Sequence, residues 1–161
     1  MKRVDFLSKL KKEGKLQIVE PSDNLRKAYD IKSGYCLKSA KILFNAGIYE
    51  NSVSEAYYSM YNSVLSLLFK CGIKSENHSA AVILLSRLFG LEDMGKILSD
   101  AKKERIDKQY YASEIESAQM TKDAAEKMIA VSEEFIISLK VYSGNLNTSS
   151  MQIIKSKFEE F

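Results

Sequence analysis

The chain has 161 residues, with 24 Lys and Arg against 21 Asp and Glu, one His, two Cys and one Pro. This length suits one domain, and the scarcity of Pro and Gly argues against a many-stranded sandwich or barrel. The formal net charge of +3 is too small to indicate a nucleic-acid partner by itself. No apolar run approaches the roughly 20 residues of a membrane span, and no signal-peptide stretch follows the charged N-terminus. We therefore expect a cytoplasmic protein without a membrane segment.

Residues 1–20 form a basic N-terminal segment, with six basic side chains against three acidic ones. Its first 13 residues fit a short amphipathic helix, because apolar side chains recur on one side at Val4, Phe6, Leu7 and Leu10. Gly14 and Pro21 bracket what we predict to be a linker to the main part of the domain.

Two long helices follow the linker. The first begins at an N-cap, Ser22, and ends near Gly47. The second runs from about Glu50 to Cys71 and carries apolar stripes on two sides, which is typical of a helix buried on two sides. We predict that its second stripe, together with part of the last long helix, is a subunit interface of a homodimer. That stripe consists of Tyr58, Tyr61, Leu65 and Phe69.

The rest of the chain also has helical patterns. Residues 78–89 predict a short helix, capped by Asn77 or Ser75, after which Gly90 and Gly95 loosen the chain. A charged helix is expected over 94–111, a long helix over 113–141, and a small helix in the tail, 147–161. The predicted fold is an all-α, up-and-down antiparallel bundle of four to five helices, with residues 22–142 forming the bundle.

The usual catalytic and metal-binding patterns are absent from the sequence. It contains no Gly-rich phosphate loop, no HExxH and no Cys pair at zinc spacing. We therefore expect neither a metal nor a cofactor. Cys36 and Cys71 fall on successive antiparallel helices about 16 Å out of register, too far for a disulfide. Two small, buried, reduced side chains are expected there.

Three segments carry side chains with useful chemistry. Tyr57 and Tyr58 either pack in the core or turn their hydroxyls into a polar cleft. Asn77 and His78 stand at the start of the short helix, where His78 is either a structural hydrogen-bonding group or part of a site. The charged stretch around Arg105 is either a solvated helix or a phosphate contact, because Arg presents a planar fork to phosphate. Its candidate residues are Lys102, Arg105, Lys108, Tyr110 and Tyr111.

These segments occur together, in this order, in a known family. The sequence AGIYENSVSEAYYSMYNSVLSLL, then GIKSENHSAAVILL, then RIDKQYY before a last long helix resembles a HEPN domain over about residues 22–140. The likeness is to an uncharacterised prokaryotic subfamily with Ala-Tyr-Tyr in its second helix. The resemblance implies a small helical bundle that forms homodimers. It also implies one half of a toxin–antitoxin-type module whose partner is a minimal nucleotidyltransferase.

The activity that the resemblance implies is metal-independent RNA cleavage at the dimer cleft, by an Arg and a His that in many members read Arg-x4-His-x-Tyr. In this chain Arg105 takes the Arg position, Tyr110 the His position and Ala112 the Tyr position. Tyrosine, with a pKa near 10, is a poor general base at neutral pH. The resemblance therefore favours a protein that binds RNA or nucleotide phosphate over an active ribonuclease.

Three hypotheses remain open on the sequence. In the first, Arg105 contacts a phosphate, Lys102 and Lys108 add positive potential, and Tyr110 and Tyr111 frame the cleft. Four residues of other segments also line this cleft, namely Tyr57, Tyr58, Asn77 and His78. In the second, the chain is a ribonuclease toxin in which His78 replaces the missing His, which requires His78 to lie close to Arg105. In the third, it is a dimerisation module without a ligand.

Overall fold

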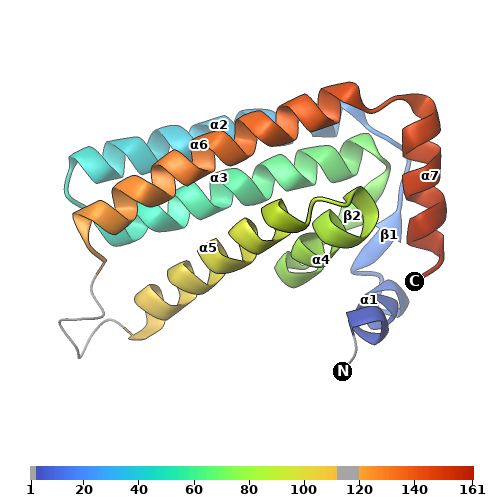
Figure 1. Cartoon of the computed structure of the whole chain (residues 1–161), viewed down its shortest axis with the longest axis horizontal. Coiled ribbons are helices and arrows are strands. Elements are labelled where there is room, and N and C mark those ends of the chain that lie inside the picture. Colours follow the sequence, from blue (N-terminus) through green and yellow to red (C-terminus); the bar gives the residue numbers. More distant parts are fainter. Residues whose placement is uncertain (1–2, 112–119) are drawn as a thin grey trace.

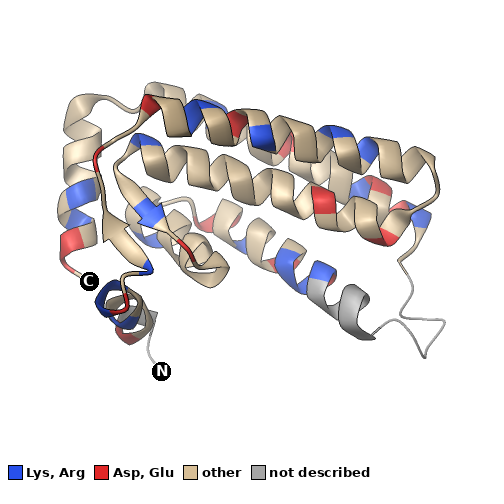
Figure 2. Cartoon of the chain, turned by 180° about the vertical axis from the view of Figure 1, so that it is seen from behind, with Lys and Arg blue, Asp and Glu red and all other residues tan. Residues whose placement is uncertain are grey.

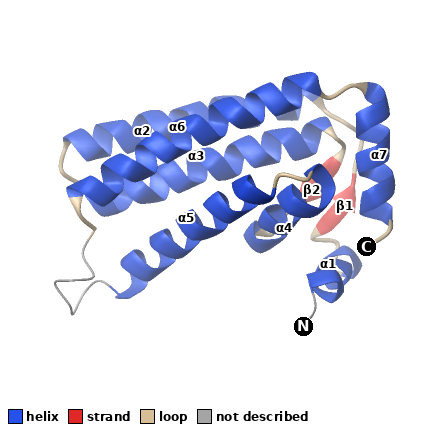
Figure 3. Ribbon diagram, viewed as in Figure 1, coloured by secondary structure: helices blue, strands red, loops and turns tan. Residues whose placement is uncertain are grey.

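The computed structural model describes the backbone at residues 3–111 and 120–161 and the side chains at residues 5–105 and 120–161. The prediction of an all-α fold is confirmed, because most of the described residues are helical (Figures 1 and 3). The elements in chain order are α1 (Arg3–Lys12), β1 (Leu16–Ile18), α2 (Asp23–Asn45), α3 (Tyr49–Lys70), β2 (Ile73–Ser75), α4 (His78–Phe89), α5 (Glu92–Tyr111), α6 (Lys122–Asn145) and α7 (Thr148–Glu159).

Helix α3 is the centre of the fold. It packs against α2 and α6 on one side and against α4 and α5 on the other (Figure 1). Tyr61, Leu65 and Phe69 are buried, and the Phe69 ring stacks on Tyr29 of α2 with 5.3 Å between ring centroids. The prediction that this stripe is a subunit interface is therefore wrong, because the stripe is covered by the protomer's own helices.

The predicted helix starts are confirmed at two side-chain caps. The hydroxyl of Ser22 accepts a hydrogen bond from the Leu25 amide, and the side chain of Asn77 accepts one from the Ala80 amide. The last long helix begins later than predicted. Thr121 caps α6 by accepting from the Ala124 amide, and Met120 and Thr121 are not helical, so α6 starts at Lys122 instead of 113.

The predicted linker contains a strand that sequence reasoning missed. Residues 16–18 pair antiparallel with β2, so that Leu16 lies opposite Ser75 and Ile18 opposite Ile73. Gly72 precedes β2 with a positive φ of 73°, and a Cβ there would lie 2.6 Å from the carbonyl oxygen of Val19. Only glycine fits this close approach, which brings the N-terminal segment onto the end of α3.

The two ends of the chain meet at one end of the bundle (Figure 1). The tail forms the predicted helix, α7, which packs on α4. The ammonium of Lys11 donates to the carbonyls of Phe158 in the last turn of α7 and of Phe161 just beyond it, at 3.0 and 2.9 Å. Leu7 and Leu10 of α1 are buried. The basic N-terminal segment is thus part of the packed domain. Among the described helices, none is both long and apolar enough to cross a bilayer.

Helices α4 and α5 approach each other closely at Gly95. A Cβ on Gly95 would lie 2.6 Å from the hydroxyl of Ser86 and 3.3 Å from the carbonyl of Val82. The expectation that Gly95 loosens the chain is wrong, because Gly95 lies inside α5 and allows tight helix packing. This packing brings the middle of α5 alongside the start of α4.

Candidate phosphate-binding site

Three tyrosines of α3 surround the first residue of α4, and we name this group the tyrosine–histidine cluster (Tyr57, Tyr58, Tyr61 and His78). The imidazole of His78 stacks on Tyr61, with 3.8 Å between ring centroids and 13° between the planes. Tyr58 meets the same imidazole edge-on, at 6.1 Å. The hydroxyl of Tyr57 lies 2.7 Å from Nδ1 of His78. These three contacts hold the partly buried imidazole against α3.

The cluster favours the neutral form of His78. Burial lowers the pKa of His78 below its ordinary value, and the positive charges of Arg105 and Lys102 lower it further. Burial also raises the pKa values of the neighbouring phenols, that of Tyr61 to about 12 and that of Tyr57 beyond it, so both stay protonated. In either tautomer of His78, Tyr57 engages one ring nitrogen and leaves the other for a ligand.

Arg105 of α5 lies against the same tyrosines. Its guanidinium carbon is 5.0 Å from the ring centroid of Tyr57 and 5.2 Å from that of Tyr58, and Nη1 donates to the Tyr58 hydroxyl at 3.2 Å. Such cation–π contacts hold the charge without neutralising it. The buried Nε has no hydrogen-bond partner, and among the described side chains no carboxylate pairs with Arg105.

A second cation stands one turn earlier on α5. Nζ of Lys102 donates to the hydroxyl of Ser79 at 2.7 Å, which ties α5 to the first turn of α4. Burial, followed by the charge of Arg105, lowers the pKa of Lys102 below its usual value. Lys102 and Ser79 also line an open groove of about 680 Å³ between α4 and α5. Basic residues gather on this part of α5 (Figure 2).

The structure brings together five residues that the sequence proposed, from three separate helices: Tyr57, Tyr58, His78, Lys102 and Arg105. Asn77 has a structural role as the N-cap of α4. The side chains of Lys108, Tyr110 and Tyr111 lie outside the described residues.

Sequence reasoning gave Tyr61 the wrong role, because it assigned this residue to a subunit interface. The spacing nevertheless indicated that Tyr61 lies beside Tyr57, since the two residues are four positions apart and share a helix face. Of the two interpretations left open, a solvated helix position and a phosphate contact, the first does not hold, because Arg105 is partly buried against two rings.

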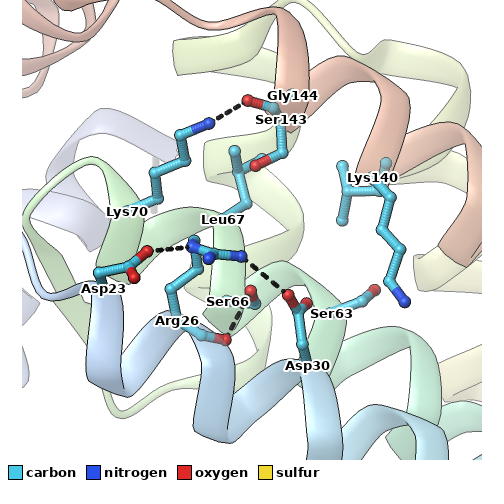
Figure 4. A pocket seen from close by; sticks show the side chains of 11 residues that line it. Asp23, Arg26, Asp30, Ser63, Ser66, Leu67, Lys70, Lys140, Ser143 and Gly144 are labelled. Carbon is cyan, nitrogen blue, oxygen red and sulfur yellow. Dashed lines mark hydrogen bonds and ion pairs between the residues drawn. The ribbon is translucent and has the colours of Figure 1, made fainter.

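A different hollow, of about 520 Å³, lies between α2, α3 and the end of α6 (Figure 4). Its arginine, Arg26, makes ion pairs with Asp23 at 2.8 Å and Asp30 at 3.1 Å. Nζ of Lys70 donates to the backbone carbonyl of Ser143. Arg26 and Lys70 are already bound to partners within the chain. This hollow therefore attracts an anion less strongly than Arg105 does. Among the described residues, no three His, Cys, Asp or Glu side chains come together to hold a metal ion.

Comparisons with known proteins identify the family of the chain. The sequence model of the family described as HEPN domain matches residues 31–142, which include α3, α4 and α5. The chain is also similar to an archaeal protein of Methanocaldococcus jannaschii, named "Putative toxin MJ0605". The two are 26% identical over 113 residues, which cover 65% of this chain and 78% of the relative.

Proposed function

Because the chain belongs to the HEPN domain family, we propose that it binds a phosphate of RNA or of a nucleotide at Arg105 and Lys102. We propose further that it is the toxin component of a toxin–antitoxin-type module. The family and the toxin-like relative fit such a module. A minimal nucleotidyltransferase as its antitoxin, and the homodimer expected from the family, are parts of the same proposal.

One observation carries the binding proposal, namely the state of the Arg105 guanidinium. It is partly buried and held by tyrosine faces, and among the described side chains its Nε has no hydrogen-bond partner. Keeping a charged group partly out of water without an acidic partner is costly, and an anion would offset that cost. Lys102 adds a second positive charge, and Arg binds phosphate with two parallel N–H groups.

The position of His78 also favours the second candidate function, ribonuclease activity. His78 and Arg105 both touch Tyr58, so they stand on one pair of rings. In RNA cleavage without metal, a base takes the proton of the 2′-hydroxyl and the 2′-oxygen bonds to phosphorus. The bond between phosphorus and the 5′-oxygen then breaks, and the 5′-oxygen leaves with a proton from the protonated base or from water. When Nδ1 of neutral His78 carries the proton and donates to the Tyr57 hydroxyl, the other ring nitrogen has a lone pair and suits the first transfer, and Arg105 suits the charge that develops on phosphate.

The experiment that tests binding is a titration of the full chain with a short RNA and with ATP at two salt concentrations. We expect Arg105→Ala to weaken binding by about 1.5–3 kcal/mol, and Arg105→Lys to recover part of this loss. Binding of the wild type should fall as salt rises, because phosphate contacts release counterions. Arg87→Ala is the matched control. Arg87 lies at the other end of α4, near the Phe161 ring, and its loss should leave binding unchanged.

Two outcomes would count against this function. If Arg105→Ala binds as tightly as the wild type while its circular dichroism spectrum is native, the site is wrong. If neither the wild type nor any variant binds RNA or ATP, the third hypothesis, a dimerisation module without a ligand, describes the protein better. Cleavage of RNA that stops when His78→Gln is introduced, and that fails on a 2′-deoxy substrate, would favour the ribonuclease candidate.

A further inference from the structure

Helices α4 and α5 border the open groove of about 680 Å³ that begins at the candidate phosphate-binding site. At one end Ser79 lies opposite Lys102, which donates to its hydroxyl. At the other end Ser86 lies opposite Gly95, where a Cβ would come within 2.6 Å of the Ser86 hydroxyl. The two helices therefore run in opposite directions along the groove (Figure 1). Small-molecule sites span about 300–1,000 Å³, so the groove has room for more of a ligand than one phosphate.

Lys102 joins the groove to Arg105. At about 100° per residue, Arg105 lies about 60° to one side of Lys102 on α5, and Ser99 about 60° to the other side. Ser99 lines the groove, whereas Arg105 contacts the rings of Tyr57 and Tyr58. A phosphate held between Arg105 and Lys102 therefore stands at the end of the groove, and the atoms attached to that phosphate have the groove beside them.

The middle of the groove suits a nucleoside. Val82 and Ile83 of α4 are partly buried and give it an apolar surface. Ser86 and Ser99 stand on its two walls and offer hydroxyls to the polar atoms of a ribose. Among the described residues that line the groove none is aromatic, so a base would not stack there. We therefore expect little dependence on which base is bound.

Lys96 stands where a second phosphate would lie. It lines the groove, it is exposed, and among the described side chains it makes no ion pair. Lys96 comes six residues before Lys102, a distance of about 9 Å along the helix axis, which leaves room for one nucleoside between the two ammonium groups. Ser99, three residues after Lys96, is on the same side of α5. Lysine and serine side chains are common phosphate contacts in nucleic-acid complexes.

Two carboxylates of the groove decide which anion suits it. Glu92 and Asp100 line it together with three lysines, Lys96, Lys102 and Lys103, so the charge of its lining is 3 − 2 = +1. A triphosphate concentrates its negative charges on adjacent groups, and both carboxylates repel them. A nucleic-acid strand carries one charge per phosphate, with an uncharged nucleoside between two charges. The lining therefore favours a strand over a nucleoside triphosphate.

We propose that the groove between α4 and α5 is a second subsite, which binds a nucleoside and the next phosphate of an RNA strand, with that phosphate at Lys96. The inference rests on the proposed function, because the first phosphate is the one held by Arg105 and Lys102. It names the ligand as a strand with at least two phosphates, in preference to a mononucleotide or ATP. The whole subsite lies within one protomer, so it does not depend on a second copy of the chain.

Titration of the full chain with uridine 5′-monophosphate and with uridine 3′,5′-bisphosphate tests the second subsite, because the two probes differ by one phosphate. We expect the wild type to bind the bisphosphate at least fivefold more tightly. Lys96→Ala should reduce the ratio of the two affinities to about one, whereas Arg105→Ala should weaken the binding of both probes at least tenfold. Lys38→Ala is the matched control, since Lys38 is also exposed but lies on α2, across α3 from the groove.

A short RNA and ATP test the class of ligand. Lys96→Ala should lower the slope of log affinity for the RNA against log salt by about 0.7, because one phosphate contact of a single strand is lost. Glu92→Gln with Asp100→Asn should raise the affinity for ATP at least threefold, because both carboxylates then cease to repel the triphosphate.

Three results would overturn the second subsite while the site at Arg105 stands: equal affinities of the wild type for the two uridine probes, a ratio that survives Lys96→Ala, or tighter binding of ATP than of the bisphosphate. If neither uridine probe binds the wild type, the proposed function fails together with this inference. Circular dichroism melting checks that the variants fold, which we expect for Lys96→Ala and Lys38→Ala because both side chains are exposed.

Discussion

Arg26 and Arg105 stand on opposite sides of the central helix and are held in different ways. Arg26 lies between two aspartates of its own helix, and its ion pairs are complete within the chain (Figure 4). Arg105 lies on the faces of two tyrosines, with a buried Nε that has no hydrogen-bond partner in the part of the chain that the structure describes. The carboxylates neutralise the charge of Arg26, whereas the charge of Arg105 stays available for an anion.

The difference teaches how to separate structural from binding arginines in a small bundle. Both are partly buried and both touch α3 or its neighbours, so burial alone does not distinguish them. The presence or absence of acidic partners distinguishes the two arginines. A guanidinium paired with two carboxylates attracts an anion weakly, while one that rests on aromatic faces keeps its positive potential. The predictions below test this contrast.

The largest expected effect concerns the rings that hold Arg105. Tyr57 is fully buried at the centre of the fold, so Tyr57→Ala should lower the free energy of unfolding by about 3–5 kcal/mol, as for other large-to-small core changes. Tyr57→Phe keeps the ring and loses only the hydrogen bond to His78, which should cost about 1 kcal/mol. Urea denaturation measures both values. Equal losses in the two variants would show that the hydroxyl dominates and the packing does not.

The next effect separates the two arginines directly. Arg26→Ala removes two partly exposed ion pairs and should lower the free energy of unfolding by about 1 kcal/mol, while RNA and ATP bind as before. Arg105→Ala should instead weaken binding at least tenfold. Fluorescence titration and thermal melting of the two variants side by side check this. Loss of binding in Arg26→Ala would mean that the hollow in Figure 4 holds the ligand.

The smallest effect is a pH dependence that comes from His78. In the unfolded chain its pKa is near 6.5, and in the fold it is lower, because of burial and then the charges of Arg105 and Lys102. Below the ordinary value, the unfolded chain therefore binds a proton that the folded chain does not. The stability that neutral His78 contributes is complete above the ordinary pKa and is lost as the pH falls toward the lowered pKa of the folded state.

Urea denaturation of wild type and His78→Gln across that pH range measures this contribution. It is the difference between the two proteins in the slope of unfolding free energy against pH. Arg105→Ala should also flatten the slope, since it removes a positive charge beside the imidazole, whereas Arg26→Ala should not. A bound phosphate should act in the same direction as Arg105→Ala, so binding should strengthen as the pH falls. Identical slopes in wild type and His78→Gln would contradict the assignment.

The sequence predicted most of the helices because their signals are local. The cap residues Ser22 and Asn77, the stop at Gly90 and the spacing of apolar residues act within a few positions of the chain. Residues such as Tyr57, His78 and Arg105 were also found as candidates, since their chemistry is visible in their identity. Gly95 was misread as a break, although α5 continues through it. Glycine is needed there because α4 lies too close for a Cβ, and a sequence does not show that distance.

By itself, then, the sequence determined an all-α bundle and the set of side chains with useful chemistry. The tertiary structure decided which of them meet. It paired residues 16–18 with β2, made Tyr61 the stacking partner of His78 instead of part of the predicted subunit interface, and left Ile31 and Ile137 exposed. Two apolar stripes of one helix look alike in a sequence. Which stripe becomes core depends on the neighbouring helices, and these contacts join residues far apart in the chain.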